Sequence, residues 1–300
     1  MSEPTFELPM PLEFSPISLR YQERYLDLLS KCPQKTSDYS FANIYGWADE
    51  YGLEWGFEQD LVWLRQHKPQ PCCWAPIGAW DKTEWEGFLP FLGNEKFQRI
   101  PEELTRVWRK EFGERMVLSE TRGQWDYLYL VRELIELRGN RFHKKKNLLN
   151  QFQRGYRAVY HELDMDCVER VLEMQHNWCT WKECADSDAL EKENSAVERV
   201  LTDWDSIPGL MGGALEVEGE IVAYTVAEAL TENTIVIHFE KGHAGYKGVY
   251  QAMNNLFLSN TATSFEYVNR EQDLDDQGLR KAKLSYNPVR FLKKYSVRFV

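Results

Sequence analysis

The chain has 300 residues and a formal net charge of −11, with 43% hydrophobic and 14% aromatic residues. This length and composition predict about two domains with packed cores. The acidic balance argues against a dedicated duplex-DNA binder. No apolar run reaches the ~18 residues that a membrane-spanning helix needs, and the N-terminus lacks the basic start and long apolar stretch of a secretory signal. We therefore expect a cytoplasmic protein without integral membrane association.

Hydrophobic periodicity predicts alternating helices and strands in the first half of the chain. Helices are expected over residues 19–29, 38–51, 82–92 and 101–112. Strands are expected over residues 53–57, 61–65, 72–76, 116–120 and 125–131. Strands that alternate with helices indicate mixed α/β layers, so we expect an α+β fold.

The window of residues 138–157 gathers seven positive charges and no acid, although the chain as a whole is acidic. We predict that most of this window is helical, with one apolar stripe made by Phe142, Leu148, Leu149 and Phe152. Lys145 lies on that stripe and Lys144 does not, so we expect Lys145 to be markedly less exposed. Two interpretations of Lys145 stay open. It snorkels from the end of the apolar face, or it lines a pocket and binds an anion.

The second half contains the clearest strand signal. After a strand at 158–163 and helices at 167–183 and 190–203, three strands at 210–217, 221–230 and 234–240 are joined by short polar connections. These predict an antiparallel meander. A helix at 248–259, a strand at 265–268, a helix at 277–284 and an extended segment at 289–300 complete the chain. The turn 241–248 is rich in glycine and leads into a helix, which is typical of a phosphate cradle. A plain strand-to-helix connection is the alternative.

The cysteines have no spacing that binds zinc or forms a redox pair. Most of them are expected to be buried and unreactive, and no metal site is predicted. The six positions are Cys32, Cys72, Cys73, Cys167, Cys179 and Cys184.

Several segments resemble one family, the bacterial proteins related to the C-terminal domain of phosphatidylglycerol lysyltransferase. The resemblance lies in residues 38–43 (DYSFAN), 125–127 (WDY), 137–139 (LRG), 142–147 (FHKKKN), 267–271 (YVNRE) and 283–288 (KLSYNP). The order of elements after residue 210 also resembles the second half of an N-acyltransferase (GNAT) domain. The resemblance implies a tandem GNAT-like fold of two similar domains, which we place at residues 1–136 and 137–300.

Members of this family and the similar Fem-type transferases move an aminoacyl group from a charged tRNA to a lipid headgroup or a peptidoglycan amine. We therefore expect an acyl- or aminoacyl-group transferase that needs no cofactor. The donor is aminoacyl-tRNA or acyl-coenzyme A, with a slight preference for the tRNA because the basic window is broader than a single pyrophosphate requires. The acceptor is an amine or a hydroxyl.

Acyl transfer requires a positioned nucleophile, donors for the developing oxyanion and a group that protonates the leaving atom. The catalytic candidates are Glu240 as base or nucleophile binder, Tyr286 as acid and Arg270 as a stabiliser of charge. The donor-binding candidates are Arg141, Lys144, Lys145, Lys146, Gly242, Gly245 and Gly248. The substrate-binding candidates are Asp126, Asn269 and Asp273. We expect Lys145, Arg270 and Tyr286 to converge on one pocket.

A second hypothesis is that the chain has this fold but does not catalyse the reaction, because a fold can persist after its function is lost. In that case the chain is a non-catalytic protein that binds a phosphate-bearing ligand. A titratable group with a perturbed pKa inside the cleft would favour the enzyme.

Overall fold

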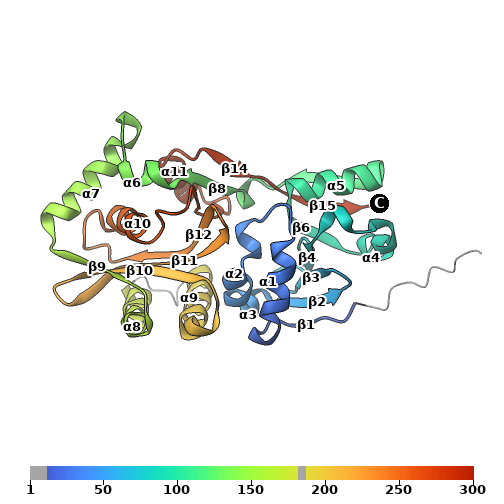
Figure 1. The fold of residues 1–300 in the computed structure, drawn as a ribbon, viewed down its shortest axis with the longest axis horizontal. Helices are drawn as coiled ribbons and strands as arrows, with labels where there is room; N and C mark the ends of the chain where they lie inside the picture. Colours follow the sequence, from blue (N-terminus) through green and yellow to red (C-terminus); the bar gives the residue numbers. More distant parts are fainter. Residues whose placement is uncertain (1–11, 182–186) are drawn as a thin grey trace, which may run out of the picture. The chain divides into compact units, whose positions relative to one another are not determined.

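The computed structural model describes residues 12–181 and 187–300. These residues form two compact units. Unit 1 contains the described residues up to 35 together with 51–122 and 293–300, and unit 2 contains residues 36–50 and 123–292. Each unit is built on its own mixed sheet with helices packed against it (Figure 1). The expectation of an α+β fold is confirmed.

The sheet of unit 1 has the strand order β1-β2-β3-β4-β6-β15-β7, with β5 paired to β3. Neighbouring strands are antiparallel except β4 and β6, which are parallel. The strands are β1 (Ser15–Pro16), β2 (Glu54–Glu58), β3 (Leu61–Gln66), β4 (Cys72–Cys73), β5 (Ile77–Gly78), β6 (Lys96–Pro101), β7 (Met116–Glu120) and β15 (Lys294–Phe299). Helix α1 (Gln22–Ser30) packs against β3 and β5, and α5 (Glu102–Phe112) packs against β6, β7 and β15.

Helix α5 follows directly from its sequence. Glu102 and Glu103 in the first turn, and Arg109 and Lys110 in the last, complement the helix dipole. Gly113 ends the helix because its φ of 54° is open to glycine at no steric cost. The buried face of α5 meets the aromatic core of unit 1, where Trp63, Trp85, Trp108, Phe97 and Phe299 pack at tilted and edge-on angles.

The predicted helix over residues 82–92 is wrong for most of its length. The segment forms short 3₁₀ turns, and only α4 (Leu89–Leu92) is α-helical. Gly87 and Pro90 interrupt the pattern, because glycine lowers helix propensity and proline removes an amide donor. Strand β6 was not predicted, because its polar residues show no clear alternation.

The sheet of unit 2 has the order β14-β8-β13-β12-β11-β10-β9, again with one parallel pair, β12 and β13. The predicted meander of β10, β11 and β12 is confirmed. The strands are β8 (Asp126–Leu130), β9 (Ala158–Glu162), β10 (Leu210–Val217), β11 (Glu220–Thr231), β12 (Thr234–Gly242), β13 (Tyr267–Asn269) and β14 (Arg290–Leu292).

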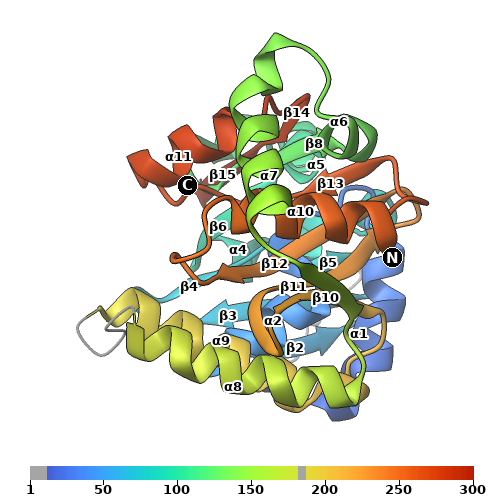
Figure 2. The ribbon, with the colours of Figure 1, turned by 90° about the vertical axis from the view of Figure 1, so that its left-hand side faces the viewer.

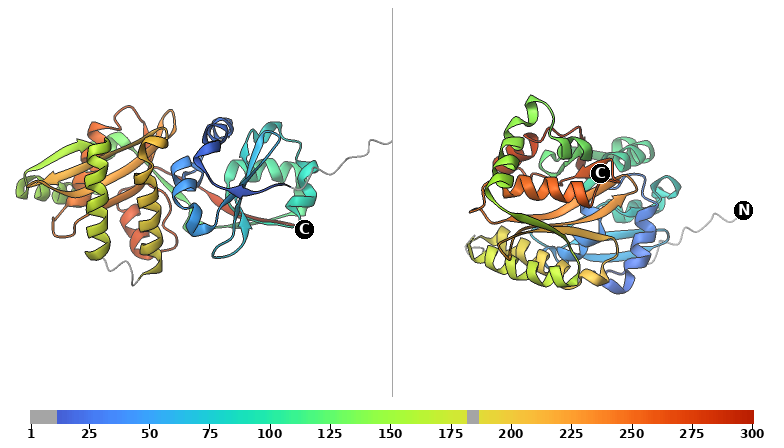
Figure 3. Two further views of the ribbon diagram at one scale, coloured as in Figure 1. Left: turned by 90° about the horizontal axis from the view of Figure 1, so that it is seen from below. Right: turned by 60° about the vertical axis from the view of Figure 1, so that its left-hand side comes forward.

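Helices cover both faces of this sheet (Figure 2). On one face lie α6 (Val131–Glu136), α7 (His143–Gly155) and α10 (Val249–Asn260), with α10 between the strands and α7. On the other face α8 (Met165–Trp181) and α9 (Asp188–Thr202) lie side by side (Figure 3), and α2 (Phe41–Gly46) packs on α9. Helix α3 (Ala48–Tyr51) follows α2, and α11 (Gln277–Leu284) precedes β14.

When the sheet of unit 1 is read from β1 and that of unit 2 from β9, both have the same succession of strand directions. In each sheet the sixth strand comes from a distant part of the chain. Strand β8 follows β7 in sequence but lies between β13 and β14 in unit 2. Strand β15 follows β14 but lies between β6 and β7 in unit 1. The compact units are therefore interleaved along the chain, whereas we expected the continuous segments 1–136 and 137–300.

Four cysteines, Cys32, Cys72, Cys73 and Cys167, are free and buried. Burial raises the pKa of Cys32 and Cys73 to about 12 and that of Cys72 to about 11, so these thiols stay protonated at neutral pH. The predictions for the side chains of Cys179 and Cys184 lie outside the described residues.

Candidate functional site

The site lies where the parallel pair of strands in unit 2 comes apart. Strand β12 pairs with β13 only from Thr234↔Tyr267 to Val236↔Asn269, although β12 continues to Gly242. Beyond this point side chains bridge the two segments. Arg270, directly after β13, donates from Nη2 to Oε1 of Glu240 on β12 at 2.9 Å. Asn254 of α10 donates to the other oxygen of Glu240 at 3.3 Å.

Two cations meet on the ring of Tyr286, which follows α11. The Lys145 Nζ lies 3.9 Å from the ring centroid, and the Arg270 Cζ lies 4.8 Å from it. Gln251 of α10 donates to the Tyr286 hydroxyl at 3.2 Å. The predicted convergence of Lys145, Arg270 and Tyr286 is confirmed, and the pocket itself stays a prediction.

Helix α7 places Lys145 as its apolar stripe predicted. Phe142, Leu149 and Phe152 are buried, Leu148 and Lys145 are half-buried, and Lys144 is exposed. Helix α7 with the preceding 3₁₀ turn spans most of the basic window, as expected. The aromatic ring under the amine provides a cation–π contact but no neutralising charge.

The electrostatics of the cluster are unbalanced. Burial, together with the nearby charge of Arg270, lowers the pKa of Lys145 to about 8. Burial alone would lower the pKa of Arg270, but the Glu240 carboxylate together with the side chains of Tyr286 and Tyr129 outweighs it and raises that pKa. Burial raises the pKa of Tyr286, so its hydroxyl keeps its proton at neutral pH. Across the described residues no carboxylate forms an ion pair with Lys145, and the one carboxylate of the cluster, Glu240, is paired with Arg270.

The remaining cations of the basic window face solvent. Arg141 pairs with Glu133, and Arg138 lies 3.4 Å from Glu136. Lys144 and Lys146 are exposed, like Arg154 and Arg157, and none of these four has an ion-pair partner within residues 12–181 and 187–300. Exposed cations on one helix form an electrostatic surface suited to a chain of phosphates.

The glycine turn has roles in packing. Gly248 has φ 86°, and a Cβ there would lie 2.1 Å from the carbonyl oxygen of Leu148 on α7. A Cβ at Gly245 would lie 2.7 Å from His243 Cε1, and one at Gly242 would lie 2.9 Å from Val249 Cγ1. These contacts explain the glycines by close approach, so their predicted binding of a donor stays a prediction.

The three substrate-binding candidates hold the loop that carries Arg270. Asp126 accepts from the amide and hydroxyl of Ser37 and from Asn269 Nδ2. Asp273 accepts two bonds from Arg280, at 2.8 and 2.7 Å, and one from the Tyr127 hydroxyl. Asp126, Asn269 and Asp273 have 0% exposed surface. Their role in the structure is positioning, and direct contact with a substrate stays a prediction.

Sequence reasoning missed a polar group centred on His238 of β12. The His238 side chain is 2% exposed, its Nδ1 lies 2.9 Å from Glu271, and its Nε2 lies 3.2 Å from Ser40 Oγ. Glu228 of β11 is also buried and accepts from the amide of Ala42. The available signal in the sequence was Glu228, an acidic residue inside the otherwise apolar strand β11.

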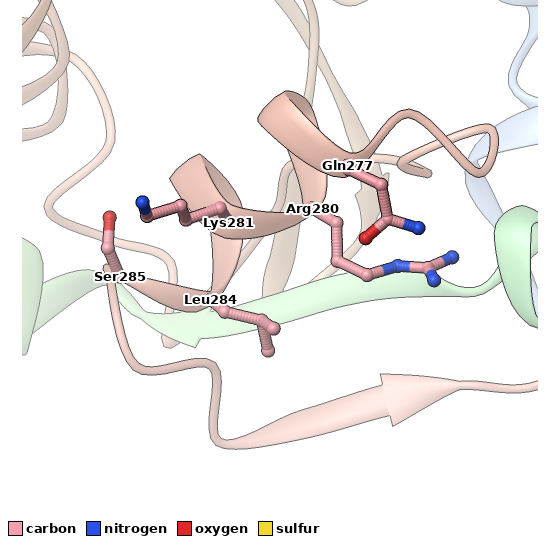
Figure 4. A pocket seen from close by; sticks show the side chains of 5 residues that line it. All are labelled: Gln277, Arg280, Lys281, Leu284 and Ser285. Atoms are coloured by element: carbon pink, nitrogen blue, oxygen red, sulfur yellow. The ribbon is translucent and has the colours of Figure 1, made fainter.

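An open depression lies elsewhere, on α11. It is lined by Gln277, Arg280, Lys281, Leu284 and Ser285, whose side chains are shown in Figure 4. None of the predicted site residues lines it, and Arg280 is already engaged by Asp273 and Asp275.

Comparison with solved structures shows the same fold in other proteins. A conserved protein of unknown function from Bacteroides thetaiotaomicron VPI-5482 is 27% identical, with a TM-score of 0.86, covering 96% of this chain and all of that one. L-PGS from Bacillus licheniformis has a TM-score of 0.59 at 12% identity, covering 92% of this chain and 91% of its own. FemX has a TM-score of 0.56 at 6% identity, covering 96% and 98%. The α+β tandem GNAT-like fold implied by the resemblance is thereby confirmed.

A curated relative, an uncharacterised protein of Mycoplasmoides gallisepticum, is 25% identical over 181 residues. That match covers 58% of this chain and 56% of the relative, so it spans little more than half of the relative's length. Within the described parts of the chain, no helix is long and apolar enough to cross a membrane. The model of the family described as "Phosphatidylglycerol lysyltransferase, C-terminal" matches residues 30–298, and the chain therefore belongs to that family.

Proposed function

We propose that the chain transfers an acyl or aminoacyl group from a phosphate-bearing donor to an amine or hydroxyl acceptor. The observation that carries this proposal is the excess positive charge on Tyr286, where Arg270 is paired with Glu240 and no carboxylate is paired with Lys145 in the part of the chain that the structure describes. A half-buried cation without an acid partner is costly, so it favours an anionic ligand. A perturbed pKa beside such a cluster is typical of a functional site.

The groups present fit the steps of acyl transfer. Glu240 accepts a proton from the attacking amine. The nitrogen of that amine forms the new bond to the acyl carbon. Lys145 and Arg270 stabilise the negative charge that develops on the carbonyl oxygen. As the bond to the leaving oxygen breaks, the Tyr286 hydroxyl gives that oxygen its proton. The proton held by Glu240 then restores Tyr286, so the protein ends unchanged.

For the donor we favour aminoacyl-tRNA over acyl-coenzyme A. The exposed cations Lys144, Lys146 and Arg154 are spread along α7, and Arg157 lies two residues beyond its end. Helix α7 has 13 residues, which at 1.5 Å per residue gives a surface of about 20 Å. That surface exceeds what one pyrophosphate covers and suits several successive phosphates of a nucleic-acid strand.

The test is turnover with defined donors and acceptors. The protein is incubated with a set of charged tRNAs or acyl-coenzyme A species and candidate amines, and loss of the acyl bond is followed. Lys145→Ala should reduce turnover at least tenfold, whereas Lys144→Ala, one residue away and exposed, serves as the matched control. If no donor turns over and Lys145→Ala leaves ligand binding unchanged, the proposal fails.

One observation favours a second candidate, a binding protein without catalysis. Glu240 already accepts hydrogen bonds from both Arg270 and Asn254, which compete with an attacking amine for its two oxygens. In that case charged tRNA binds through Lys145 and Arg270, but its ester hydrolyses no faster than in buffer.

A further inference from the structure

The segment that presents Arg270 is held at every residue. Asn269 binds Asp126 through its side chain, and the Arg270 amide donates to the Tyr127 carbonyl at 3.0 Å. Lys283 of α11 donates from Nζ to the Arg270 carbonyl at 2.5 Å and also to the Gln272 carbonyl. The guanidinium of Arg270 therefore leaves a backbone with little freedom.

Glu271 is the strained residue of this segment. Its φ is 56°, in the left-handed region that residues other than glycine rarely adopt. Such a residue persists only where its surroundings hold it. The Glu271 amide donates to Asn269 Oδ1 at 2.8 Å, its carbonyl accepts from the Tyr127 amide at 3.2 Å, and its carboxylate lies 2.9 Å from His238 Nδ1.

His238 reaches Glu271 because of an irregularity in the sheet. Val226 of β11 pairs with Phe239 and Ala227 pairs with Ile237, so His238 is the extra residue of a β-bulge in β12. Bulges redirect side chains and are common next to functional sites. Two parallel bridges then join β12 to the loop after β13, from His238 to Glu271 and from Glu240 to Arg270.

We propose that His238 is a positioning residue that fixes the left-handed turn at Glu271 and thereby aims the Arg270 guanidinium at Glu240 and Tyr286. Its importance for transfer rests on the proposed function, but the positioning itself does not. The bulge, the burial of the imidazole and the strained turn carry this inference.

The charges around His238 favour its protonated form. Glu228 on β11, Glu271 after β13 and Asp126 on β8 are the carboxylates that act on it. Burial alone would lower the pKa of His238, but these carboxylates outweigh it and raise that pKa above its ordinary value. Lys283 also interacts electrostatically with Glu271, and burial lowers the pKa of Lys283 to about 8. The charged imidazole donates from both ring nitrogens, to Glu271 and toward Ser40 and Glu228.

The pH dependence follows from the direction of this shift. A histidine whose pKa is raised by folding contributes its full stabilisation below the unfolded value of about 6.5. That contribution is lost as the pH rises through the higher folded value. The turn at Glu271 should therefore loosen on the alkaline side, and the positioning of Arg270 should loosen with it.

Hydrogen–deuterium exchange tests the positioning without any substrate. In His238→Gln and in Glu271→Gln, amides of residues 269–272 should exchange at least about tenfold faster than in the unaltered protein, because a charge-assisted hydrogen bond is lost. The matched control is His67→Gln, which removes another histidine–glutamate pair, with Glu54 at 2.8 Å in unit 1. That control should leave the exchange rates of the amides of residues 269–272 unchanged.

Two further measurements complete the test. NMR titration of the His238 imidazole should show a midpoint above 6.5, and protection of residues 269–272 should fall across that midpoint. Binding of inorganic pyrophosphate should weaken about tenfold in Glu271→Gln. Unaltered exchange in both variants, or a midpoint at or below 6.5, overturns the inference. Absence of pyrophosphate binding with the exchange effect intact would instead count against the proposed function alone.

Discussion

Replacing Arg270 by methionine tests the central ion pair of unit 2. The side chains of Arg270 and Glu240 are 15% and 10% exposed, so both charges are largely removed from water. Without the guanidinium, the hydrogen bond from Asn254 at 3.3 Å is the one that Glu240 keeps among the described residues. Breaking a buried pair costs about 3–5 kcal/mol. Because some exposure and one donor remain, we expect Arg270→Met to lower the free energy of unfolding by about 3 kcal/mol.

A double-mutant cycle separates the pair from general loss of packing. Glu240→Gln alone should cost about 2 kcal/mol, because the largely buried guanidinium of Arg270 is then left without a carboxylate. The double variant should be more stable than the sum of the single losses predicts, with a coupling energy of about 2 kcal/mol. Urea denaturation followed by circular dichroism at pH 7 measures these values, and Lys144→Met provides an exposed control.

The same variant also changes the neighbouring amine. Since the charge of Arg270 helps to lower the pKa of Lys145, Arg270→Met should raise that pKa from about 8 toward its ordinary value. NMR of the lysine side chains reports this directly. A loss below about 1 kcal/mol for Arg270→Met, or a coupling energy of zero, would refute the account of the pair.

Three further predictions concern other groups. Because only the ammonium form of Lys145 attracts an anion, pyrophosphate affinity should fall as the pH rises through about 8, which calorimetry at several pH values measures. Burial alone would raise the pKa of Asp273, but the bonds from Arg280, Tyr127 and the Asp275 amide together outweigh it and hold that pKa at about 2, below the unfolded value of about 3.9. Its stabilisation should thus be lost between about pH 4 and pH 2, and Asp273→Asn should flatten the acid limb of the unfolding curve. Gly248→Ala should destabilise the protein by at least about 2 kcal/mol, because φ is positive and the methyl group meets the Leu148 carbonyl; an unchanged urea midpoint would contradict this.

Local patterns were sufficient where packing on one face dictates the sequence. The alternation along β10, β11 and β12 predicted the meander, and the stripe on α7 predicted that Lys145 would be less exposed than Lys144. The clustering of Lys145 with Arg270 and Tyr286 was predicted because Lys145 lies on the apolar face of a predicted helix, while Arg270 and Tyr286 follow the ends of predicted elements. The contacts of Lys145 and Arg270 with the Tyr286 ring became visible only in the folded chain. These predictions rest on periods of two and of three to four residues, which the side chains of a single element record.

Other features depend on partners that no local pattern names. The exchange of β8 and β15 was not predictable, because a strand's alternation shows that one face is buried but not which sheet receives it. The His238 group was missed for a related reason. Ser40, Glu228, His238 and Glu271 come from separate elements, and the bulge that turns His238 aside arises only from the pairing of β11 with β12.

The exchange of strands also governs when each sheet can be completed during synthesis. Unit 1 contains most of the first third of the chain, yet β15, between its β6 and β7, consists of residues 294–299 of 300. Because β15 is translated after β14, the sheet of unit 1 has to stay open until every strand of unit 2 has been made. Unit 2, in contrast, has all of its strands as soon as β14 emerges. Deletion of residues 293–300 should therefore damage unit 1, although the rest of that unit is translated before most of unit 2.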